Sequence, residues 1–566
     1  MKKRHNASLA EIWRLLGTLE LTRTGREMIF NFRRLSLQKC LWAILAFMFV
    51  APAMAADRPN ILFIFSDDHA PHAIGAYNGW LKSVNPTPNI DKLAAQGTLF
   101  ENSFCTNSIC GPSRAVILSG KHSHKNGFMN NGNSFDWDQQ TFAKILQKSG
   151  YNTAIYGKSH LKGEPQGFDD WKVLPGQGLY YNPDMKTPKG MKRIEGHCTD
   201  IVTDLAIEWL KDGREADKPF CLMVQHKAPH RNWMPAERHL HLYDDIEIPY
   251  PNTLFDKWHD NAPPARFQEL EIDRHMHLNF DLFVDLTADF PDVKGRFDRS
   301  AWRNLKRMTP AQTKAWRDAY GPKDAEFHKL NPQADDLVRW KFQRYAKNYL
   351  RCVKGVDESV GKLMATLDEM KLDDNTVVIY SSDQGFYIGD HGWYDKRWMY
   401  EESLKMPFIC KWPGVTKPGS RVKELIQNLD YGETFIEMAG ADIPSDMQGQ
   451  SLVPLLKGEH PDDWRKSIYY HYYEYPSVHM VPRHYGVRTE RYKLIYFYQF
   501  DEWEFYDLKA DPDELQNEYE NAEYAEQIAA HKTELTRLRK HYDDKSDTGV
   551  MPKEWQDEVR NQRAAK

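Results

Sequence analysis

Four short, largely apolar runs, each followed by charged or amide side chains, give this chain its main pattern. They span residues 60–66, 152–156, 220–225 and 376–381. Apolar runs of this length without regular alternation are typical of strands buried on both faces of a parallel sheet. Ligands of open α/β sheets bind beyond the carboxyl ends of the strands. We therefore expect the polar residues that follow the four runs to converge on one crevice.

Helical patterns separate these runs. Helices are predicted over residues 88–94, 141–148 and 199–210, and apolar positions at intervals of three and four predict a long helix over 342–367. Another strand is expected over 406–409. Strands that alternate with helices predict the α/β fold class, with a large, mixed but mostly parallel sheet sandwiched by helices.

The length of 566 residues fits one large domain and one smaller one. We expect the large domain over residues 56–456. Within it, residues 231–335 form a polar and aromatic segment with proline-rich turns, which we interpret as an insertion over the face that carries the crevice.

The remainder of the chain has a different pattern, because aromatic and polar residues alternate from residue 467 onward. This alternation predicts a smaller C-terminal α+β subdomain over residues 465–545, made of antiparallel strands and a closing helix over 524–542. Residues 546–566 form a polar tail, and the chain after Asp543 is expected to be mobile.

The N-terminus resembles an export signal. Basic residues precede the apolar run 41–50, and Ala53-Met54-Ala55 is a small-x-small cleavage pattern. The run is too short for a stable membrane anchor. We expect residues 1–55 to be an N-terminal extension and signal peptide, and the mature chain to be periplasmic or secreted. Either Met1 or Met28 can be the start.

Charge and cysteine content exclude some classes of protein. The net charge is −5, with no strongly basic run outside the N-terminus, which argues against a nucleic-acid partner. Of the seven cysteines, Cys40 lies in the signal segment. The others besides Cys110 have no metal-site spacing and allow at most two disulfides. Cys221 and Cys352 lie in apolar patterns and are expected in the core.

Acidic and amide residues follow the first and last of the four runs. Asp67 and Asp68 come directly after residues 60–66, and Asp383 and Gln384 follow 376–381. Adjacent carboxylates repel one another unless a cation separates them, so the pair is typical of a hard-metal site, with a helix N-cap as the alternative.

Basic residues follow the other two runs. Lys158 and His160 come after residues 152–156, and His226 and His230 come after 220–225. A single lysine or histidine here would more often be a surface residue. Their placement after buried strands makes them candidates for anion binding and proton transfer.

The stretch Cys110-Gly111-Pro112-Ser113-Arg114 precedes a short apolar run that ends at Gly120. It places Cys110 at a loop-to-helix junction, where backbone N–H groups and the positive end of the helix favour an anion. Arg114 adds a planar fork of donors for an oxyanion. A buried thiol before an ordinary helix is the alternative.

This stretch resembles the signature of the formylglycine-dependent (type I) sulfatases of the alkaline phosphatase superfamily, Cys-x-Pro-Ser-Arg followed by Leu-[Thr/Ser]-Gly. The resemblance implies an alkaline-phosphatase-like fold and hydrolysis of sulfate esters. It also implies that a formylglycine-generating maturation enzyme converts Cys110 to 3-oxoalanine (formylglycine). One Ca²⁺ per chain would be held by Asp67, Asp68, Cys110, Asp383 and Gln384. The family usually has Asn or His where this chain has Gln384.

The resemblance also implies roles for the basic residues. The hydrated aldehyde would attack sulfur and form a covalent sulfo-enzyme, and its second hydroxyl would then expel sulfate. Arg114 and the metal would hold the nucleophile, and Lys158 and Lys396 would bind sulfate oxygens. His230 would act as the general acid and His160 would assist regeneration of the nucleophile, although these two roles can be exchanged.

Residues 382–387 and 395–403 are similar to a bacterial branch of this family that acts on polysaccharides and mucins. Its members are often N-acetylglucosamine-6-sulfatases, and marine relatives act on ulvan. The implied substrate is a sulfated carbohydrate, either algal or a glycosaminoglycan or mucin. Candidate substrate contacts, which could equally be residues of the fold, are His226, Arg397, His479, Arg483 and His484.

Two other functions remain open at this point. A phosphonate or phosphate ester hydrolase could share the scaffold and its metal carboxylates. A non-catalytic glycan-binding protein could have evolved from the same fold, but the presence of Cys110, Arg114, Lys158, His160, His230 and Lys396 argues against it.

Overall fold

The computed structural model describes residues 58–84, 86–285 and 302–557. The predicted signal peptide and both possible start positions lie outside the described residues. None of the helices in the described part of the chain is both long and apolar enough to span a membrane.

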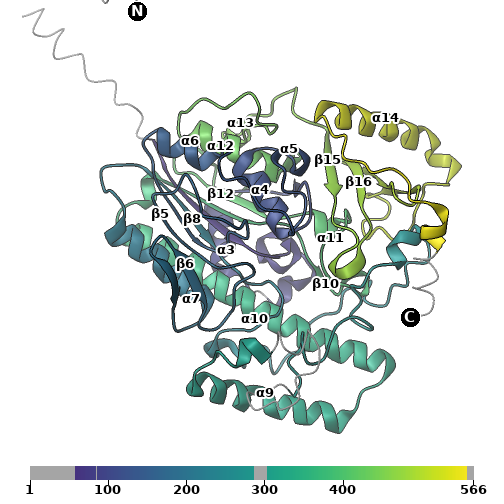
Figure 1. The fold of residues 1–566 in the computed structure, drawn as a ribbon, viewed down its shortest axis with the longest axis horizontal. Helices are drawn as coiled ribbons and strands as arrows, with labels where there is room; N and C mark the ends of the chain where they lie inside the picture. Colours follow the sequence, from purple (N-terminus) through teal and green to yellow (C-terminus); the bar gives the residue numbers. More distant parts are fainter. Residues whose placement is uncertain (1–57, 85, 286–301, 558–566) are drawn as a thin grey trace, which may run out of the picture. The chain divides into compact units, whose positions relative to one another are not determined.

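A ten-stranded sheet forms the centre of the fold (Figure 1). In spatial order its strands are β13 (Ser420–Val422), β2 (Thr98–Phe100), β12 (Phe408–Lys411), β9 (Thr376–Ser382), β1 (Asn60–Ser66), β8 (Phe220–Gln225), β4 (Asn152–Gly157), β5 (Asp170–Val173), β6 (Asp184–Thr187) and β7 (Gly190–Arg193). The five central strands from β9 to β5 are parallel, whereas β12, β6 and β7 pair antiparallel with their neighbours. The predicted mixed, mostly parallel sheet is confirmed.

The register brings the ends of the four predicted strands to one edge of the sheet. Ser66 of β1 lies opposite Ser382 of β9, and Phe65 lies opposite Gln225 of β8. Gln225 in turn lies opposite Gly157 of β4. The residues that directly follow these four strands therefore start from neighbouring positions.

Helices cover both faces of this sheet, and β1 supplies side chains to both sides. Leu62 and Ile64 join one apolar core, while Ile61, Phe63 and Phe65 join the other. This period of two is expected of a strand buried on both faces. On the first face lie α3 (Pro88–Gln96), α7 (Cys198–Glu208) and α10 (Ala334–Glu369); on the second lie α4 (Cys110–Ser119), α6 (Phe142–Lys148) and α12 (Tyr431–Met438).

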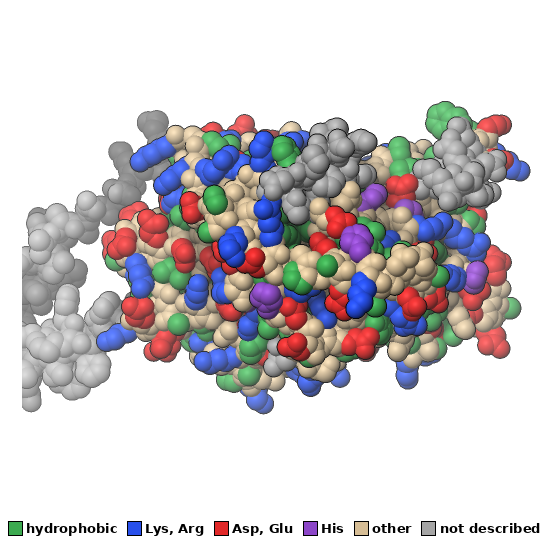
Figure 2. Space-filling model, turned by 90° about the horizontal axis from the view of Figure 1, so that it is seen from below, with side chains coloured by type: hydrophobic (Ala, Val, Ile, Leu, Met, Phe, Trp, Pro, Cys, Tyr) green, Lys and Arg blue, Asp and Glu red, His purple; other side chains and the backbone are tan. Residues whose placement is uncertain are grey.

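Shorter elements and α9 complete the part of the chain that precedes the C-terminal sheet. Two small sheets pair β3 with β14 and β10 with β11. The bounds are β3 (Ser103–Phe104), β14 (Ile426–Gln427), β10 (Tyr387–Ile388), β11 (Tyr394–Asp395), α5 (Ser123–Asn126), α9 (Pro310–Leu330), α11 (Glu401–Leu404) and α13 (Val453–Leu456). Acidic and basic side chains are interspersed over the face of the molecule drawn in Figure 2.

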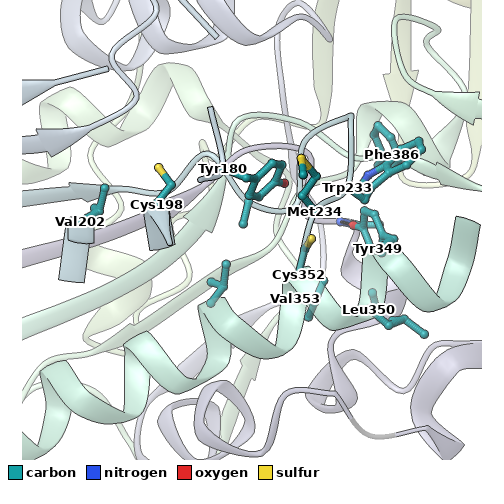
Figure 3. Close-up of a cluster of buried hydrophobic side chains, with 14 of the residues drawn as sticks. Tyr180, Cys198, Val202, Trp233, Met234, Tyr349, Leu350, Cys352, Val353 and Phe386 are labelled. Atoms are coloured by element: carbon teal, nitrogen blue, oxygen red, sulfur yellow. Dashed lines mark hydrogen bonds between the residues drawn. The ribbon is translucent and has the colours of Figure 1, made fainter. Parts of the chain in front are cut away.

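The long helix α10 carries much of the first core (Figure 3). Its Tyr349, Cys352 and Val353 side chains lie close to Tyr180 and Trp233, which come from other segments of the chain. The expected burial of Cys221 and Cys352 is confirmed, since both are 1% exposed. All six cysteines in the described ranges are buried free thiols.

A second, antiparallel sheet follows the large unit, as predicted. Its four strands are β15 (Ser467–Tyr472), β16 (His484–Thr489), β17 (Tyr492–Phe497) and β18 (Glu502–Asp507), in that spatial order. The closing helix α14 (Ala525–His541) packs on this sheet through Ile528, Leu535 and Leu538.

The chain just after Asp543 differs from the mobile tail that we predicted. Asp544 is 4% exposed and accepts hydrogen bonds from the Tyr469 hydroxyl at 2.6 Å and from His471 Nδ1 at 2.8 Å. Further along, the Met551 backbone N–H donates to the Gln499 carbonyl at 2.9 Å. The sequence did not predict these contacts. Asp544 has polar neighbours in sequence, and its two hydrogen-bond donors come from a strand that is distant along the chain.

Candidate active site

The four sheet-edge segments meet in a buried cluster of charged side chains. Asp67 and Asp68 follow β1, Lys158 follows β4, and Asp383 follows β9; each of the four is completely buried. His230, five residues beyond β8, approaches Asp68, with 3.7 Å between His230 Nε2 and Asp68 Oδ2. The predicted convergence on one crevice is thus present in the structure.

Cys110 is the first residue of α4 and points into this cluster. Its Sγ lies within 4.8 Å of a carboxylate oxygen of Asp67 and of a ring nitrogen of His230. All ten residues of α4 are buried, and Gly120 ends the helix in the left-handed conformation at φ 62°. Ser113 ties the helix to the end of β9, because its hydroxyl donates to the Asp383 carbonyl at 2.5 Å.

Arg114 links the ends of the four strands. Its Nε and Nη2 lie 3.1 and 3.0 Å from Asp383 Oδ2, and Nη2 lies 3.4 Å from Asp67 Oδ2. Nη1 donates to Gln225 Oε1 at 3.2 Å and to the Lys158 carbonyl. The planar guanidinium uses its fixed fork of donors to hold several acceptors at once.

The two lysines pair with the two adjacent carboxylates. Lys158 pairs with Asp67, and Lys396 Nζ lies 2.7 Å from Asp68 Oδ2. Lys158 Nζ also donates to Gln177 Oε1 at 2.5 Å. Although burial opposes it, Asp395 and Asp68 raise the pKa of Lys396, so this ammonium group keeps its charge.

Asp68 adopts a left-handed backbone conformation, and a tyrosine from α10 holds it there. Its φ is 66°, which is uncommon for a residue other than glycine. The Tyr349 hydroxyl donates to the Asp68 carbonyl at 2.7 Å and accepts from the Ala70 N–H at 3.0 Å. Tyr349 also stacks on Phe386, at an angle of 11° between the rings.

The acidic groups fit a hard cation. Ligand oxygens of Asp67, Asp68 and Asp383 lie within 4.8 Å of one another. Burial and the neighbouring carboxylates raise the pKa of Asp68, while nearby cations such as Lys158 hold the pKa of Asp67 below its ordinary value against burial. Carboxylate oxygens are the type of ligand that Ca²⁺ prefers.

Gln384 completes this set with an amide oxygen. Its Nε2 donates to Asp68 Oδ1, which turns the other end of the amide away. Its Oε1 is buried and accepts no hydrogen bond within the described ranges, as is also true of Asp67 Oδ1. A bound cation would satisfy buried acceptors without donors, so Asp67 Oδ1 and Gln384 Oε1 are candidate ligand atoms.

The two predicted catalytic histidines have different surroundings. His230 Nδ1 lies 2.5 Å from the Arg231 carbonyl, so this nitrogen carries the hydrogen and Nε2 faces the cluster. His160 is partly buried, with a left-handed backbone at φ 58°, and its Nδ1 lacks a partner among the described residues. Burial and the adjacent Lys158 lower the pKa of both rings.

The predicted substrate contacts divide into two groups. Arg397 is 6% exposed, and its Nη1 lies 3.7 Å from Asp395 Oδ1. Its Nε lacks a partner among the described residues. His479 Nε2 lies 3.2 Å from Asp395 Oδ2. Asp395 directly precedes Lys396, so this group adjoins the charged cluster.

The other three lie elsewhere. His226 is completely buried, and its Nε2 lies 2.9 Å from Ser359 Oγ of α10, in the packing between helix and sheet. His484 is also completely buried, with its ring among Trp398, Tyr470, Tyr472 and Phe497. Arg483 lies beside Tyr498. For His226 and His484 the structure therefore favours a role in the fold over substrate contact, because neither ring is accessible.

Sequence reasoning missed three residues that contact this cluster. Asp395 was predictable, because it directly precedes Lys396 and Arg397. Gln177 and Tyr349 were not predictable: the first lies in a loop 19 residues after Lys158, and the second belongs to an apolar stripe typical of core.

Two family profiles match this chain. The profile described as Sulfatase matches residues 59–441, and the profile described as N-sulphoglucosamine sulphohydrolase, C-terminal, matches residues 389–541. An N-acetylglucosamine-6-O-sulfatase of Bacteroides thetaiotaomicron is 45% identical over 496 residues, which are 86% of this chain and 87% of that protein.

Two further similarities extend this result. An ulvan-active sulfatase of Formosa agariphila is 27% identical over 406 residues, which are 71% of this chain and 59% of that protein. A solved structure of a protein in complex with its substrate, D-glucosamine-2-N,6-O-disulfate, superposes with a TM-score of 0.84 at 44% identity. That match covers 87% of this chain and 99% of the other one.

Proposed function

The chain belongs to the sulfatase family, and on this premise we propose that it hydrolyses the 6-O-sulfate ester of a glucosamine unit in a sulfated carbohydrate. The observation that carries the proposal is the buried cluster in which Cys110 and His230 adjoin two ion-paired lysines and three carboxylates. The 45% identity to an N-acetylglucosamine-6-O-sulfatase supports glucosamine as the sugar.

Two groups that the family implies would complete the site. Conversion of Cys110 to formylglycine by a maturation enzyme supplies a hydrated aldehyde, with one hydroxyl to attack sulfur and a second to release the sulfate. A Ca²⁺ ion, for which Asp67, Asp68, Asp383 and Gln384 are the ligand candidates along with residue 110, supplies positive charge for the nucleophile and a sulfate oxygen.

Lys158 and Lys396 would bind the remaining sulfate oxygens. Both ammonium groups are buried and fixed by carboxylates, so they need no reorganisation when charge shifts toward sulfur in the transition state. Arg114 would hold Asp383 and Asp67 in place and keep the start of α4 close to them.

His230 would protonate the leaving alcohol oxygen from Nε2. Its Nδ1 is already committed to the Arg231 carbonyl, so the transferable proton must be on Nε2. The ring is neutral in the free protein because burial lowers its pKa. A sulfate monoester brings a negative charge beside it and favours the protonated form. His160 would assist the proton transfer that restores residue 110.

The surroundings of the cluster would select the sugar. We propose that Arg397, with Asp395 and His479 beside it, contacts sugar hydroxyls, because Arg397 is buried and keeps Nε without a partner in the described part of the chain. From the described parts of the segment 231–335, residues such as Arg231, Phe280 and Arg307 would form a wall of the substrate cleft. Residues 1–55 would direct export to the periplasm or the medium, where sulfated polysaccharides are found.

Sulfate release by the matured full-length enzyme tests this proposal. N-acetylglucosamine-6-O-sulfate, an N-acetylglucosamine sulfated at O3, a sulfated ulvan fragment and a phosphonate monoester would be compared at equal concentration. We expect kcat/KM to be highest for the 6-O-sulfate. Preferred turnover of the phosphonate would contradict the proposal, and preference for ulvan would move it to another sugar.

A further inference from the structure

A cleft of about 590 Å³ opens beside His230, and nearly all of the charged side chains that line it are basic. Its lining also includes Gln177, the residue that holds Lys158 Nζ, so the cleft adjoins the charged cluster. The chain has a net charge of −5, and Figure 2 shows interspersed charges over one face. The cleft instead has an excess of basic residues. Besides His230, its charged lining residues are Lys227, Arg231, Arg303, Arg307 and one acid, Asp184.

Two of these cations are neutralised within the protein. Arg231 donates to both carboxylate oxygens of Asp281, at 2.6 and 3.1 Å. Arg307 Nη2 lies 3.0 Å from Asp184 Oδ1 and 2.6 Å from the Asn182 carbonyl. Neither guanidinium therefore needs a ligand to balance its charge.

Lys227 has no such partner. It is 4% exposed, and within the described ranges no carboxylate oxygen lies within 4.0 Å of its ammonium group. Its Nζ makes one long hydrogen bond, 3.4 Å to the Arg231 carbonyl, and lies 4.9 Å from the centre of the Tyr180 ring. Neither contact replaces a counter-ion.

A buried cation without a counter-ion is costly to the fold. Burial, with repulsion from Lys158, lowers the pKa of Lys227 to about 8, so most of the population still carries the charge at neutral pH. An anion delivered by a ligand would offset this cost, and the cleft provides the space for one.

We propose that this cleft binds a second anionic group of the substrate, with Lys227 as its counter-ion. The inference rests on the proposed function, since it assigns the cleft to the same carbohydrate whose 6-O-sulfate is hydrolysed. The chemistry required is a sulfate or carboxylate on or next to the glucosamine. An N-sulfate on the sugar itself and the carboxylate of an adjoining uronic acid both satisfy it.

Binding to a full-length Cys110→Ala variant tests the cleft without turnover. Calorimetric titrations in calcium buffer would give the dissociation constants of glucosamine-2-N,6-O-disulfate, of N-acetylglucosamine-6-O-sulfate, and of a disaccharide that joins a uronic acid to N-acetylglucosamine-6-O-sulfate. We expect Lys227→Met to weaken at least one doubly charged ligand about tenfold relative to the monosulfate, and Lys227→Arg to restore most of this preference. Which ligand loses affinity identifies the source of the anion.

Lys341→Met is the matched control. Lys341 is also a buried lysine whose hydrogen bonds go to backbone carbonyls, those of Ile272 and Asp273, but it does not line the cleft. We expect it to leave the ratio of the dissociation constants unchanged. If Lys227→Met unfolds the protein, Arg307→Gln provides a second test, because it removes a positive charge from the cleft, leaves Asp184 with Arg193 as its remaining ion-pair partner, and should shift the ratio in the same direction.

Two outcomes would overturn the inference. In the first, Lys227→Met leaves the ratio of the dissociation constants, doubly charged ligand to monosulfate, within twofold of the parent value for both doubly charged ligands. The other is an equal loss for all three ligands, which would assign Lys227 to the support of His230 and Lys158. Failure of the matured wild-type enzyme to release sulfate would instead contradict the proposed function. The ratio of the dissociation constants does not depend on turnover, so it would still test anion binding in the cleft.

Discussion

The edge of the ten-stranded sheet and the C-terminal four-stranded sheet both bury charges, but they satisfy them differently. At the sheet edge, Lys396 pairs with Asp68, while Gln384 Oε1 in the same cluster has no donor within the described ranges. In the C-terminal sheet, Lys493 Nζ lies 2.9 Å from Glu401 and 2.7 Å from Glu514, which balances its charge within the protein. The regions thus differ in how their carboxylates are grouped: three carboxylates lie within 4.8 Å of one another at the sheet edge, whereas Lys493 lies between two glutamates in the C-terminal network.

The largest effect is expected from removing one lysine in each region. Lys396→Met should lower kcat/KM about 10²–10³-fold, because a fixed charge that stabilises the transition state is lost. Lys493→Met should instead lower the free energy of unfolding by about 3–5 kcal/mol, because it takes the cation away from buried Glu514, whereas Glu401 keeps its ion pair with Arg488. Kinetics and chemical denaturation of both variants check this. An equal loss of kcat/KM per folded molecule in the two variants would contradict the assignment of Lys396 to catalysis and of Lys493 to stability.

A smaller effect is expected where the core supports the site. Tyr349→Phe removes the hydroxyl that holds the Asp68 carbonyl and keeps the ring that stacks on Phe386. We expect calcium affinity, measured by titration, to fall about 10–100-fold, as for other groups that orient ligands from outside the coordination shell. Tyr345→Phe is the control, since its hydroxyl donates to the Tyr387 carbonyl in the same core. A similar loss in both variants would show a general effect of α10.

The two histidines of the C-terminal segment sharpen the comparison further. His479→Ala should raise KM about tenfold and change kcat less, because His479 holds Asp395 and would position the Arg397 group that contacts the sugar rather than the sulfur. His484→Phe should leave KM unchanged, since this ring is enclosed by aromatic side chains. Steady-state kinetics of both variants on one sulfated sugar measure these changes in KM. A rise in KM for His484→Phe would contradict the assignment of His484 to the core.

A further effect concerns acid stability and leaves catalysis unchanged. Burial lowers the pKa of His484 to about 3, whereas an unfolded chain would have the ordinary value near 6.5. Between these values the unfolded state binds more protons, so the free energy of unfolding should fall as the pH is lowered. His484→Phe should reduce this slope by up to about 1.4 kcal/mol per pH unit. Urea denaturation at several pH values measures it, and parallel curves for the two proteins would contradict the placement of His484.

The sheet-edge site was predictable because parallel strands share one edge. Asp67, Lys158, His230 and Asp383 follow continuous apolar runs, so their convergence required only the strand order. Tyr349 was not predictable, since an apolar stripe on a helix does not tell which hydroxyl reaches a strained carbonyl.

The C-terminal segment shows the limit more clearly. His479 and His484 are five residues apart in the same aromatic sequence, yet one adjoins the charged cluster and the other is core. The difference comes from a left-handed turn at His479, with φ 68°, and from the packing of β16 against Trp398. Neither feature is encoded in a local pattern. Tertiary packing therefore decides which aromatic neighbours of a site take part in it.

The most direct test of the account compares the chemical state of Cys110 with sulfate release. Preparations made with different amounts of a co-expressed maturation enzyme would be digested, and the mass of the peptide that contains Cys110 would give the fraction of aldehyde. We expect the rate of sulfate release from N-acetylglucosamine-6-O-sulfate to rise in proportion to this fraction and to extrapolate to zero for the unmodified thiol. Full activity in a preparation that contains only the thiol would contradict it.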